Sequence, residues 1–197
     1  MNAEKRIVLA LKAYSQEKPP ESVDILERAA KSGSVLNTDL HRSLADGSIH
    51  LDVVAPVLPP EAADSRPLGY LILKANAENF LFPLIQSWPV ASQTAESLLV
   101  KRDGDEVLFL NELRHKKGAA LNLRLPLTRT EVPAVRAALG DYGTYEGVDY
   151  RGVKVLAATS PVFNTCWSVV AKMDRAEALA GWRRRSNLII LFLISLI

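Results

Sequence analysis

The chain has 197 residues, of which 48% are hydrophobic and 23% are charged, and its formal net charge is +2. This composition is that of a globular protein and excludes a disordered chain. The small net charge excludes the strongly basic surface that nucleic-acid binding requires, so neither DNA nor RNA is expected as a partner.

The N-terminal third is predicted to hold two helices followed by two strands. Apolar residues at helical spacing predict an amphipathic helix over residues 1–14, which lacks the uninterrupted apolar core of a secretory signal. Pro19-Pro20 ends that helix, and Ser22 can cap a second helix that stops at Gly33. A polar linker then leads to the predicted strands, His50–Val57 and Leu68–Leu73.

No predicted strands precede these two, so residues 1–75 are interpreted as the end of an incomplete domain or as a small appendage to the rest of the chain. Residues 76–91 are predicted to form a connecting helix, capped by Asn76 and kinked at Pro83.

Residues 92–174 have the clearest pattern. Asp103-Gly104 between two apolar runs predicts a hairpin in which both turn residues take positive φ. Thr130 can cap a helix that ends before Gly140. The predicted strands are Ser97–Arg102, Asp105–Leu110, Thr144–Tyr150, Val153–Val162 and Thr165–Met173. Their short connections force antiparallel neighbours, which predicts an α+β fold built on a five-stranded sheet.

The C-terminal end is predicted to be one helix that becomes apolar. Asp174 can cap it, with Glu177 at the spacing of a capping box. Residues 175–187 form its first part, and residues 188–197 are almost entirely apolar. A spanning helix needs about 20 such residues, so this run is interpreted as the start of a transmembrane helix behind Arg183–Arg185. The alternative is a hydrophobic tail that docks on the protein.

No residue pattern in the sequence is typical of catalysis. It contains no Gly-rich phosphate loop and no Gly-x-Ser-x-Gly nucleophile elbow. His41, His50 and His115 are scattered and are expected to be surface or hydrogen-bonded residues. Cys166 is the only cysteine, which excludes an internal disulfide, and it is expected to be a small core residue. We therefore expect no enzyme activity in this chain, and no metal or cofactor.

Several stretches form a pattern that resembles a known family. They are Thr94–Gly104, Val107–Asn111, Asp149–Ala158, Pro161-Val162 and Trp167–Asp174. Over about residues 92–175 the chain resembles the membrane-proximal half of a double Cache domain, a PAS-like module on the outer face of bacterial receptors. Residues 51–73 are similar to the closing strands of the membrane-distal half, whose opening strands would lie upstream of Met1.

The resemblance implies a homodimeric receptor of the inner (cell) membrane, in contact with lipid, whose sensor domain lies on the periplasmic side. It implies a cytoplasmic output domain absent from this chain, such as a histidine kinase, a diguanylate cyclase or phosphodiesterase, or a chemotaxis signalling domain. Arg183–Arg185 would then lie outside, against the usual cytoplasmic preference of arginine, which is tolerable because the first membrane helix usually sets the topology.

In such domains the ligand pocket lies between the sheet and the segments covering it, here residues 111–125 and the helix before Gly140. The candidate ligand-binding residues are Arg114, His115, Arg124, Tyr145 and Asp149. An arginine can grip a carboxylate through two hydrogen bonds, and Tyr or Asp can orient an amine or a hydroxyl. The alternative is that these are ordinary residues of a solvated loop and of strands.

The sequence leaves three hypotheses for the function. The first is a module that binds a small molecule, such as a carboxylate or amine metabolite, and shifts the helix after Asp174. The second is a ligand-independent structural module that dimerises and spaces the output domain from the membrane. The third, a small membrane-anchored enzyme, lacks the residue groupings that catalysis would need.

Overall fold

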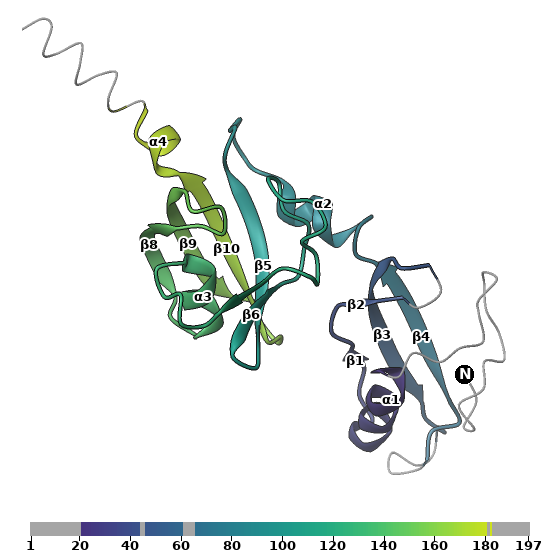
Figure 1. Cartoon of the computed structure of the whole chain (residues 1–197). Coiled ribbons are helices and arrows are strands. Elements are labelled where there is room, and N and C mark those ends of the chain that lie inside the picture. Colours follow the sequence, from purple (N-terminus) through teal and green to yellow (C-terminus); the bar gives the residue numbers. More distant parts are fainter. Residues whose placement is uncertain (1–20, 44–45, 61–65, 181, 183–197) are drawn as a thin grey trace, which may run out of the picture. The chain divides into compact units, whose positions relative to one another are not determined.

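The computed structural model describes residues 21–43, 46–60, 66–180 and 182. The chain divides into two compact units, Met1–Pro83 (the N-terminal unit) and Leu84–Ile197 (the C-terminal unit), both visible in Figure 1. The division falls inside the predicted connecting segment, residues 76–91. The helix predicted over residues 1–14 and the apolar run over residues 188–197 lie outside the described residues.

The N-terminal unit is a small antiparallel sheet with one helix packed against it (Figure 1). Its elements are α1 (Glu21–Ser32), β1 (Leu36–Asn37), β2 (His41–Arg42), β3 (Ile49–Val57) and β4 (Gly69–Asn76). Strand β3 pairs with β4 on one side and with β1 and β2 on the other. The two longer strands confirm the sequence prediction. Strands β1 and β2 have two residues each and fall in the predicted polar linker.

The two faces of this small sheet differ. Ile25 and Leu26 of α1 pack on Val54 and Tyr70, which places the core on one face. Side chains alternate along a strand, so the even-numbered residues of β3 share that face. On the opposite face Leu71 and two other apolar side chains are exposed, and β4 pairs only with β3 among the described residues.

Helix α2 (Leu81–Gln86) is shorter than the predicted connecting helix. The Asn76 side chain accepts hydrogen bonds from the backbone N–H groups of Glu78 and Asn79, so it forms a turn and does not cap the helix. Pro83 lies in the first turn, where a proline is tolerated, so it introduces no kink.

The C-terminal unit is an antiparallel sheet with the strand order β7-β6-β5-β10-β9-β8 (Figure 1). Its elements are β5 (Glu96–Asp103), β6 (Glu106–Phe109), β7 (Arg124–Pro126), α3 (Pro133–Ala138), β8 (Gly143–Val148), β9 (Lys154–Pro161), β10 (Trp167–Asp174) and α4 (Arg175–Ala178). The predicted α+β fold is confirmed. The sheet has a sixth strand because residues 124–126 pair with β6.

Strand β10 lies in the middle of this sheet and leads directly into α4. Helix α3 covers the sheet, with Val132 and Val135 in one core with Leu98 and Phe109. Val132 is the N-cap of α3 and makes no side-chain cap, since Pro133 starts the helix in place of the predicted Thr130 cap.

Two local predictions are corrected in this unit. Asp103 pairs with Glu106 and does not have positive φ, so the turn residues are Gly104, with a φ of +63°, and Asp105, which matches a turn with glycine first. Cys166 is exposed, because it lies in the turn before β10 and outside the strand.

No described helix combines the length and apolarity needed to cross a membrane.

Candidate functional site

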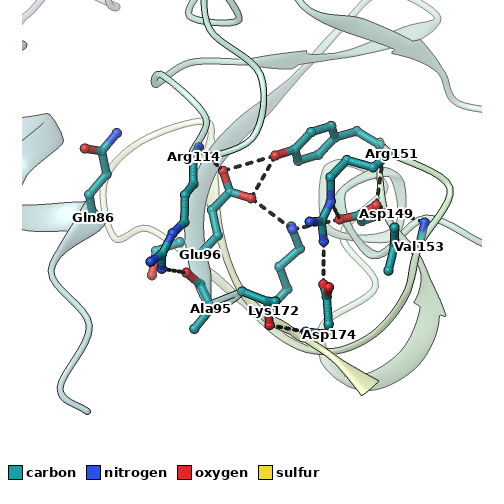
Figure 2. Close-up of polar contacts among 12 residues, drawn as sticks. Gln86, Ala95, Glu96, Arg114, Asp149, Arg151, Val153, Lys172 and Asp174 are labelled. Carbon is teal, nitrogen blue, oxygen red and sulfur yellow. Dashed lines mark hydrogen bonds and ion pairs between the residues drawn. The ribbon is translucent and has the colours of Figure 1, made fainter. Parts of the chain in front are cut away.

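A buried lysine on β10, Lys172, is the centre of a cluster of polar side chains in the C-terminal unit (Figure 2). Lys172 Nζ lies 2.8 Å from Asp149 Oδ2 and 2.9 Å from Glu96 Oε2, and all three side chains are 2% exposed. The strand register explains the contact between Lys172 and Glu96, because Glu96 on β5 is the direct partner of Lys172. Asp149 follows β8 and reaches the lysine from the other side.

Two further side chains surround this triad. The Tyr150 hydroxyl donates to Glu96 Oε2 at 3.0 Å, and Lys172 Nζ lies 5.0 Å from the centre of the Tyr150 ring. Arg151 donates from Nε to Asp149 Oδ2 at 2.7 Å and from its terminal nitrogen to Asp174. We call these five residues and Asp174 the lysine-centred network.

The two carboxylates that contact Lys172, Glu96 and Asp149, are well supplied with donors. Asp149 Oδ1 accepts the backbone N–H groups of Arg151 and Val153, at 2.8 and 3.2 Å. Glu96 Oε1 accepts the backbone N–H of Arg114. Buried charges are tolerated when hydrogen bonds satisfy them in this way. The network is thus internally satisfied.

The charge states of the network follow from these contacts. Burial alone would raise the pKa of Asp149, but the hydrogen bonds and charges of Lys172 and Arg151 outweigh it, so that pKa is lowered. Burial and the neighbouring Glu96 carboxylate raise the pKa of Tyr150, which therefore keeps its proton. Asp149 is ionised and Tyr150 is a neutral donor.

A small cavity lies beside the network, between α3 and the sheet. Its walls are Leu98, Phe109, Val132, Pro133, Ala134, Asp149, Tyr150, Val170 and Lys172. Its volume is about 10 Å³, which is the space of roughly one water molecule. Pockets for small ligands are commonly ~300 Å³ or larger, so the cavity is too small to hold a metabolite in this structure.

The lysine-centred network continues into the start of α4. The backbone N–H of Asp174 donates to Thr94 Oγ1 at 3.1 Å. The Glu177 carboxylate on α4 accepts the Ser92 hydroxyl at 2.8 Å and the Thr94 backbone N–H at 2.9 Å. Hydrogen bonds from the Thr94 and Ser92 side chains lower the pKa of Glu177 to about 2. Asp174 is the N-cap of α4 but gives its side chain to Arg151, and Glu177 binds the segment before β5 in place of the predicted capping box.

The structure brings together two of the residues predicted to bind a ligand. Asp149 lies inside the network, and Arg114 joins it through its backbone N–H. The Arg114 guanidinium donates to the carbonyl oxygens of Ala95 and Ser92, at 2.8 and 3.0 Å. It therefore holds the segment that precedes β5.

The other three predicted residues do not line the cavity, although the backbone of His115 hydrogen-bonds Tyr150. His115 is exposed. Arg124 forms an ion pair with Asp103 at 2.6 Å, on the β5–β6 hairpin. The Tyr145 hydroxyl donates to Asp141 at 2.7 Å.

The sequence prediction did not include Glu96, Tyr150, Arg151 and Lys172. Lys172 could have been found from the sequence, because it lies two residues after Val170 on β10 and therefore shares the face of the strand that points into the core.

A second buried carboxylate lies in the N-terminal unit. Asp52 on β3 has a side chain that is 3% exposed, and its Oδ2 lies 3.8 Å from His41 Nε2 and 3.9 Å from Lys74 Nζ. Its register partner is Lys74 on β4, and His41 on β2 is the partner of His50. Burial raises the pKa of Asp52, against the opposing charges of Lys74 and His41.

Two buried atoms of this group are not hydrogen-bonded to any described residue, namely Asp52 Oδ1 and His50 Nδ1. The other ring nitrogen of His50, Nε2, lies 2.7 Å from Ser48 Oγ, which lies 2.5 Å from Asp46 Oδ1. Nowhere in the described parts of the chain do three metal-ligating side chains come together.

Solved structures with a similar fold include ligand-binding, sensory and extracellular domains of bacterial receptors and of a putative histidine kinase. The ligand-binding domain of the Pseudomonas aeruginosa amino acid chemoreceptor PctB, in complex with L-Arg, is 18% identical with a TM-score of 0.51, and the match covers 78% of this chain and 60% of that one. The periplasmic sensory domain of the Campylobacter jejuni chemoreceptor Tlp1 is 16% identical with a TM-score of 0.54, covering 81% and 56%. This is the fold of a Cache-type sensor domain.

A third structure of this fold is the extracellular domain of the putative histidine kinase mmHK1S-Z3, which is 16% identical with a TM-score of 0.55 and coverages of 80% and 55%. This chain thus spans between 55% and 60% of the length of these three structures. No protein-family model and no curated protein matches the sequence. A shared fold hosts many functions, so the function has to be argued from the chain itself.

Proposed function

We propose that this chain is the extracytoplasmic, small-molecule-sensing part of a transmembrane receptor of the inner membrane. Ligand binding changes the position or stability of α4, and α4 passes that change to a cytoplasmic output domain such as a histidine kinase or a diguanylate cyclase. The observation that carries the proposal is the continuous set of contacts from the cavity wall to α4. It runs from Lys172 through Asp149, Arg151, Asp174 and Thr94 to Glu177.

The fold supports a sensing role, since the similar structures are sensory domains and not catalytic ones. PctB was solved with L-Arg, and a small metabolite with an amino or a carboxylate group is the proposed ligand here. Arg114, His115, Arg124, Tyr145 and Asp149 remain the proposed contacts in the C-terminal unit. Of these, Asp149 is the one that lines the cavity.

The N-terminal unit is proposed to be the closing part of a membrane-distal half. Both units combine a helix with short and long antiparallel strands and end in a strand that leads to a short helix. In the C-terminal unit the last strand, β10, has β5 on one side and β9 on the other. Its counterpart β4 pairs only with β3 among the described residues, so further strands can add to its other edge.

The experiment combines a ligand screen with a local readout at α4. Carboxylates, amines and amino acids are tested for a rise in melting temperature, because a ligand that binds the folded state stabilises it. Hydrogen exchange then follows the amides of residues 174–179 with and without each hit. We expect at least one hit to change exchange there. A broad screen with no stabilising compound would contradict ligand sensing.

The alternative is a structural module that dimerises without a ligand. The small cavity and the satisfied network favour it, because neither requires a bound molecule. Sedimentation and crosslinking distinguish the two. A constitutive dimer that no compound in the screen stabilises supports the structural module, whereas ligand-dependent protection at α4 supports the sensor.

A further inference from the structure

One end of the C-terminal unit carries exposed basic residues close to the start of α4. The loop after β6 exposes three of them in a row, which we call the basic tip: His115, Lys116 and Lys117. The Arg114 guanidinium, next to the tip, donates to two carbonyl oxygens of residues 92–95 (Figure 2). Glu177 of α4 accepts hydrogen bonds from the same segment. The basic tip and α4 therefore lie at the same end of the sheet.

The loop that carries the basic tip is held in place from inside the protein. The Glu112 carboxylate accepts the backbone N–H groups of Gly118 at 2.8 Å and Ala120 at 3.2 Å, which closes the loop on itself. The backbone of His115 hydrogen-bonds Tyr150, which fixes the loop to the lysine-centred network. Backbone and carboxylate contacts thus build the loop, and the charged ends of the two lysines are left to point into solvent.

The carboxylates near α4 do not neutralise the basic tip. Among the described residues around this helix, several carboxylates have their hydrogen bonds or ion pairs with groups outside the tip, namely Glu96, Glu112, Glu146, Asp174 and Glu177. The negative charges are thereby satisfied by the protein itself, while the lysines of the tip face outward. Such an arrangement makes the outer surface positive and attracts an anionic partner.

The other side of α4 adds to this surface. Lys154 is exposed at the start of β9, and its neighbour Val155 pairs with Asp174, the residue before α4. Trp182 is 73% exposed just beyond α4. Tryptophan is enriched at the level of the lipid headgroups, and lysine can lay its apolar stem along a surface while its ammonium group reaches a charge. This combination is typical of a surface that meets a membrane.

We infer that this end of the C-terminal unit docks on an anionic lipid surface. The basic tip and Lys154 bind the phosphate groups of the lipids, and Trp182 lies at the headgroup level. In the sequence Trp182 is followed by Arg183–Arg185 and by the apolar residues 188–197. A membrane entered by that apolar run would face this end of the unit.

This inference rests on the proposed function in one respect, that the chain beyond α4 enters a membrane. It adds a partner for the sensor domain itself. Because the loop of the basic tip and α4 bind the same segment, residues 92–95, lipid charge becomes one of the factors that hold α4 in position.

The test measures binding of the full chain to vesicles of phosphatidylcholine alone and of an equal mixture of phosphatidylcholine and phosphatidylglycerol. We expect tighter binding to the mixture, and loss of that preference at high salt. The double variant Lys116→Gln, Lys117→Gln should weaken binding to the mixture about 25-fold, because each lysine near an anionic surface contributes about fivefold. The apolar run contributes equally in every variant, so the difference measures the tip.

The matched control is the double variant Lys101→Gln, Arg102→Gln, which removes the same charge near the other end of β5. This strand has 8 residues and is therefore ~25 Å long, which exceeds the screening length of about 10 Å at moderate salt. The control should bind as the unchanged chain does. Lipids with a paramagnetic headgroup should broaden the amide resonances of residues 114–118 and 154 and spare those of residues 101–104.

Three outcomes would overturn the inference. The first is equal binding to the two kinds of vesicle. The second is an equal loss of binding in both double variants, which is the result for net charge without a defined surface. The third is that glycerol phosphate in solution shifts residues 115–117 as strongly as the vesicles do, which assigns the tip to a free anion.

The outcome for the proposed function is separate. If a compound changes hydrogen exchange at residues 174–179 while the chain shows no preference for anionic lipid, the sensor proposal stands and this surface falls. If the tip binds anionic lipid in a chain that no compound stabilises, the surface stands and ligand sensing falls.

Discussion

Each unit pairs a lysine on its last strand with a buried carboxylate on the neighbouring strand, but the contacts differ. Lys172 faces Glu96 across β10 and β5 at 2.9 Å, and its side chain is 2% exposed. Lys74 faces Asp52 across β4 and β3 at 3.9 Å, and its side chain is 25% exposed. The same register position thus holds a tight buried ion pair in one unit and a loose, partly solvated one in the other.

The difference teaches where a ligand could gain affinity. In the lysine-centred network the protein's own donors already fill the carboxylate oxygens, so a ligand would have to break hydrogen bonds before forming its own. At Asp52 a buried oxygen accepts nothing from the described residues, so a donor added there restores a bond that desolvation removed. The first arrangement is closed by the protein's own donors, whereas the second leaves one carboxylate oxygen without a hydrogen bond from the described residues.

The largest expected effect comes from Lys172→Met, which should destabilise the C-terminal unit by about 3–5 kcal/mol. The substitution leaves Glu96 and Asp149 buried without their shared cation, and breaking a buried ion pair by removing one partner costs about this much. The loss should appear in urea unfolding followed by hydrogen exchange of the β10 amides.

Removing the charges of all three groups together is the control for that prediction. The triple variant Glu96→Gln, Asp149→Asn, Lys172→Met should recover part of the loss, since replacing a whole buried ion cluster is often close to neutral. If Lys172→Met alone costs less than about 1 kcal/mol, which is the range of exposed ion pairs, the network is not the buried cluster that its exposures indicate.

The opposite sign is expected in the other unit, where Asp52→Asn should raise the stability by about 1–3 kcal/mol in the absence of ligand. The substitution removes a negative charge whose burial raises the pKa of Asp52, and leaving a buried polar group without its hydrogen bond costs about this much, and more when the group is charged. The measurement is the unfolding midpoint of the β3 amides by hydrogen exchange in urea. Asp149→Asn supplies the comparison, because it removes a carboxylate that is fully hydrogen-bonded and should lower stability.

The pH dependence of the two units should also differ in sign. The pKa of Asp149 is lowered from 3.8, so its contribution to stability is complete above that value and is lost as the pH falls through the lowered pKa. The pKa of Asp52 is raised from 3.8. Its ionised form is penalised on folding, so the N-terminal unit should gain stability from this group as the pH falls through the raised pKa.

Hydrogen exchange of β3 and β10 amides at a series of pH values measures the change in stability of each unit with pH in the same sample. Asp52→Asn should remove the gain in the N-terminal unit and leave the acid loss of the C-terminal unit unchanged. Parallel loss in both units on acidification would contradict the contrast between the two carboxylates.

The fold was predictable from the sequence because its strands are long and end at strong turns. The hairpin at Gly104 and the alternation of apolar and polar residues along β9 and β10 predict most of the strands of the C-terminal sheet. The two-residue strand β2 gave no such signal, so His41 was assigned to a linker. Its pairing with His50, and hence the group around Asp52, could not be seen without the register.

The candidate site was harder to predict because burial decides which charged residues matter. Arg124 and Tyr145 have suitable chemistry, yet their partners are Asp103 and Asp141 on the surface. Lys172 was detectable from its inward position on β10. Its two carboxylate partners come from β5 and from the segment after β8, which lie far apart in sequence and meet only in the folded sheet.

The smallest effect is expected at the junction between the network and α4, from Glu177→Gln. Glu177 is partly exposed, so its loss should leave the unfolding of β10 almost unchanged. Its contacts with Ser92 and Thr94 nevertheless tie α4 to the segment before β5, and a neutral amide is a weaker acceptor than a carboxylate. The amides of residues 175–179 should therefore exchange faster, while those of β10 keep their protection.

Arg175→Gln is the matched control, because it removes the exposed ion pair between Arg175 of α4 and Glu146 of β8 without touching residues 92–94. If Glu177→Gln and Arg175→Gln loosen α4 equally, the effect is a general loss of surface charge and the connection through Thr94 is not specific. If only Glu177→Gln does so, and ligand protection of α4 disappears with it, then the contact from Thr94 to Glu177 is the step by which the sheet controls the helix.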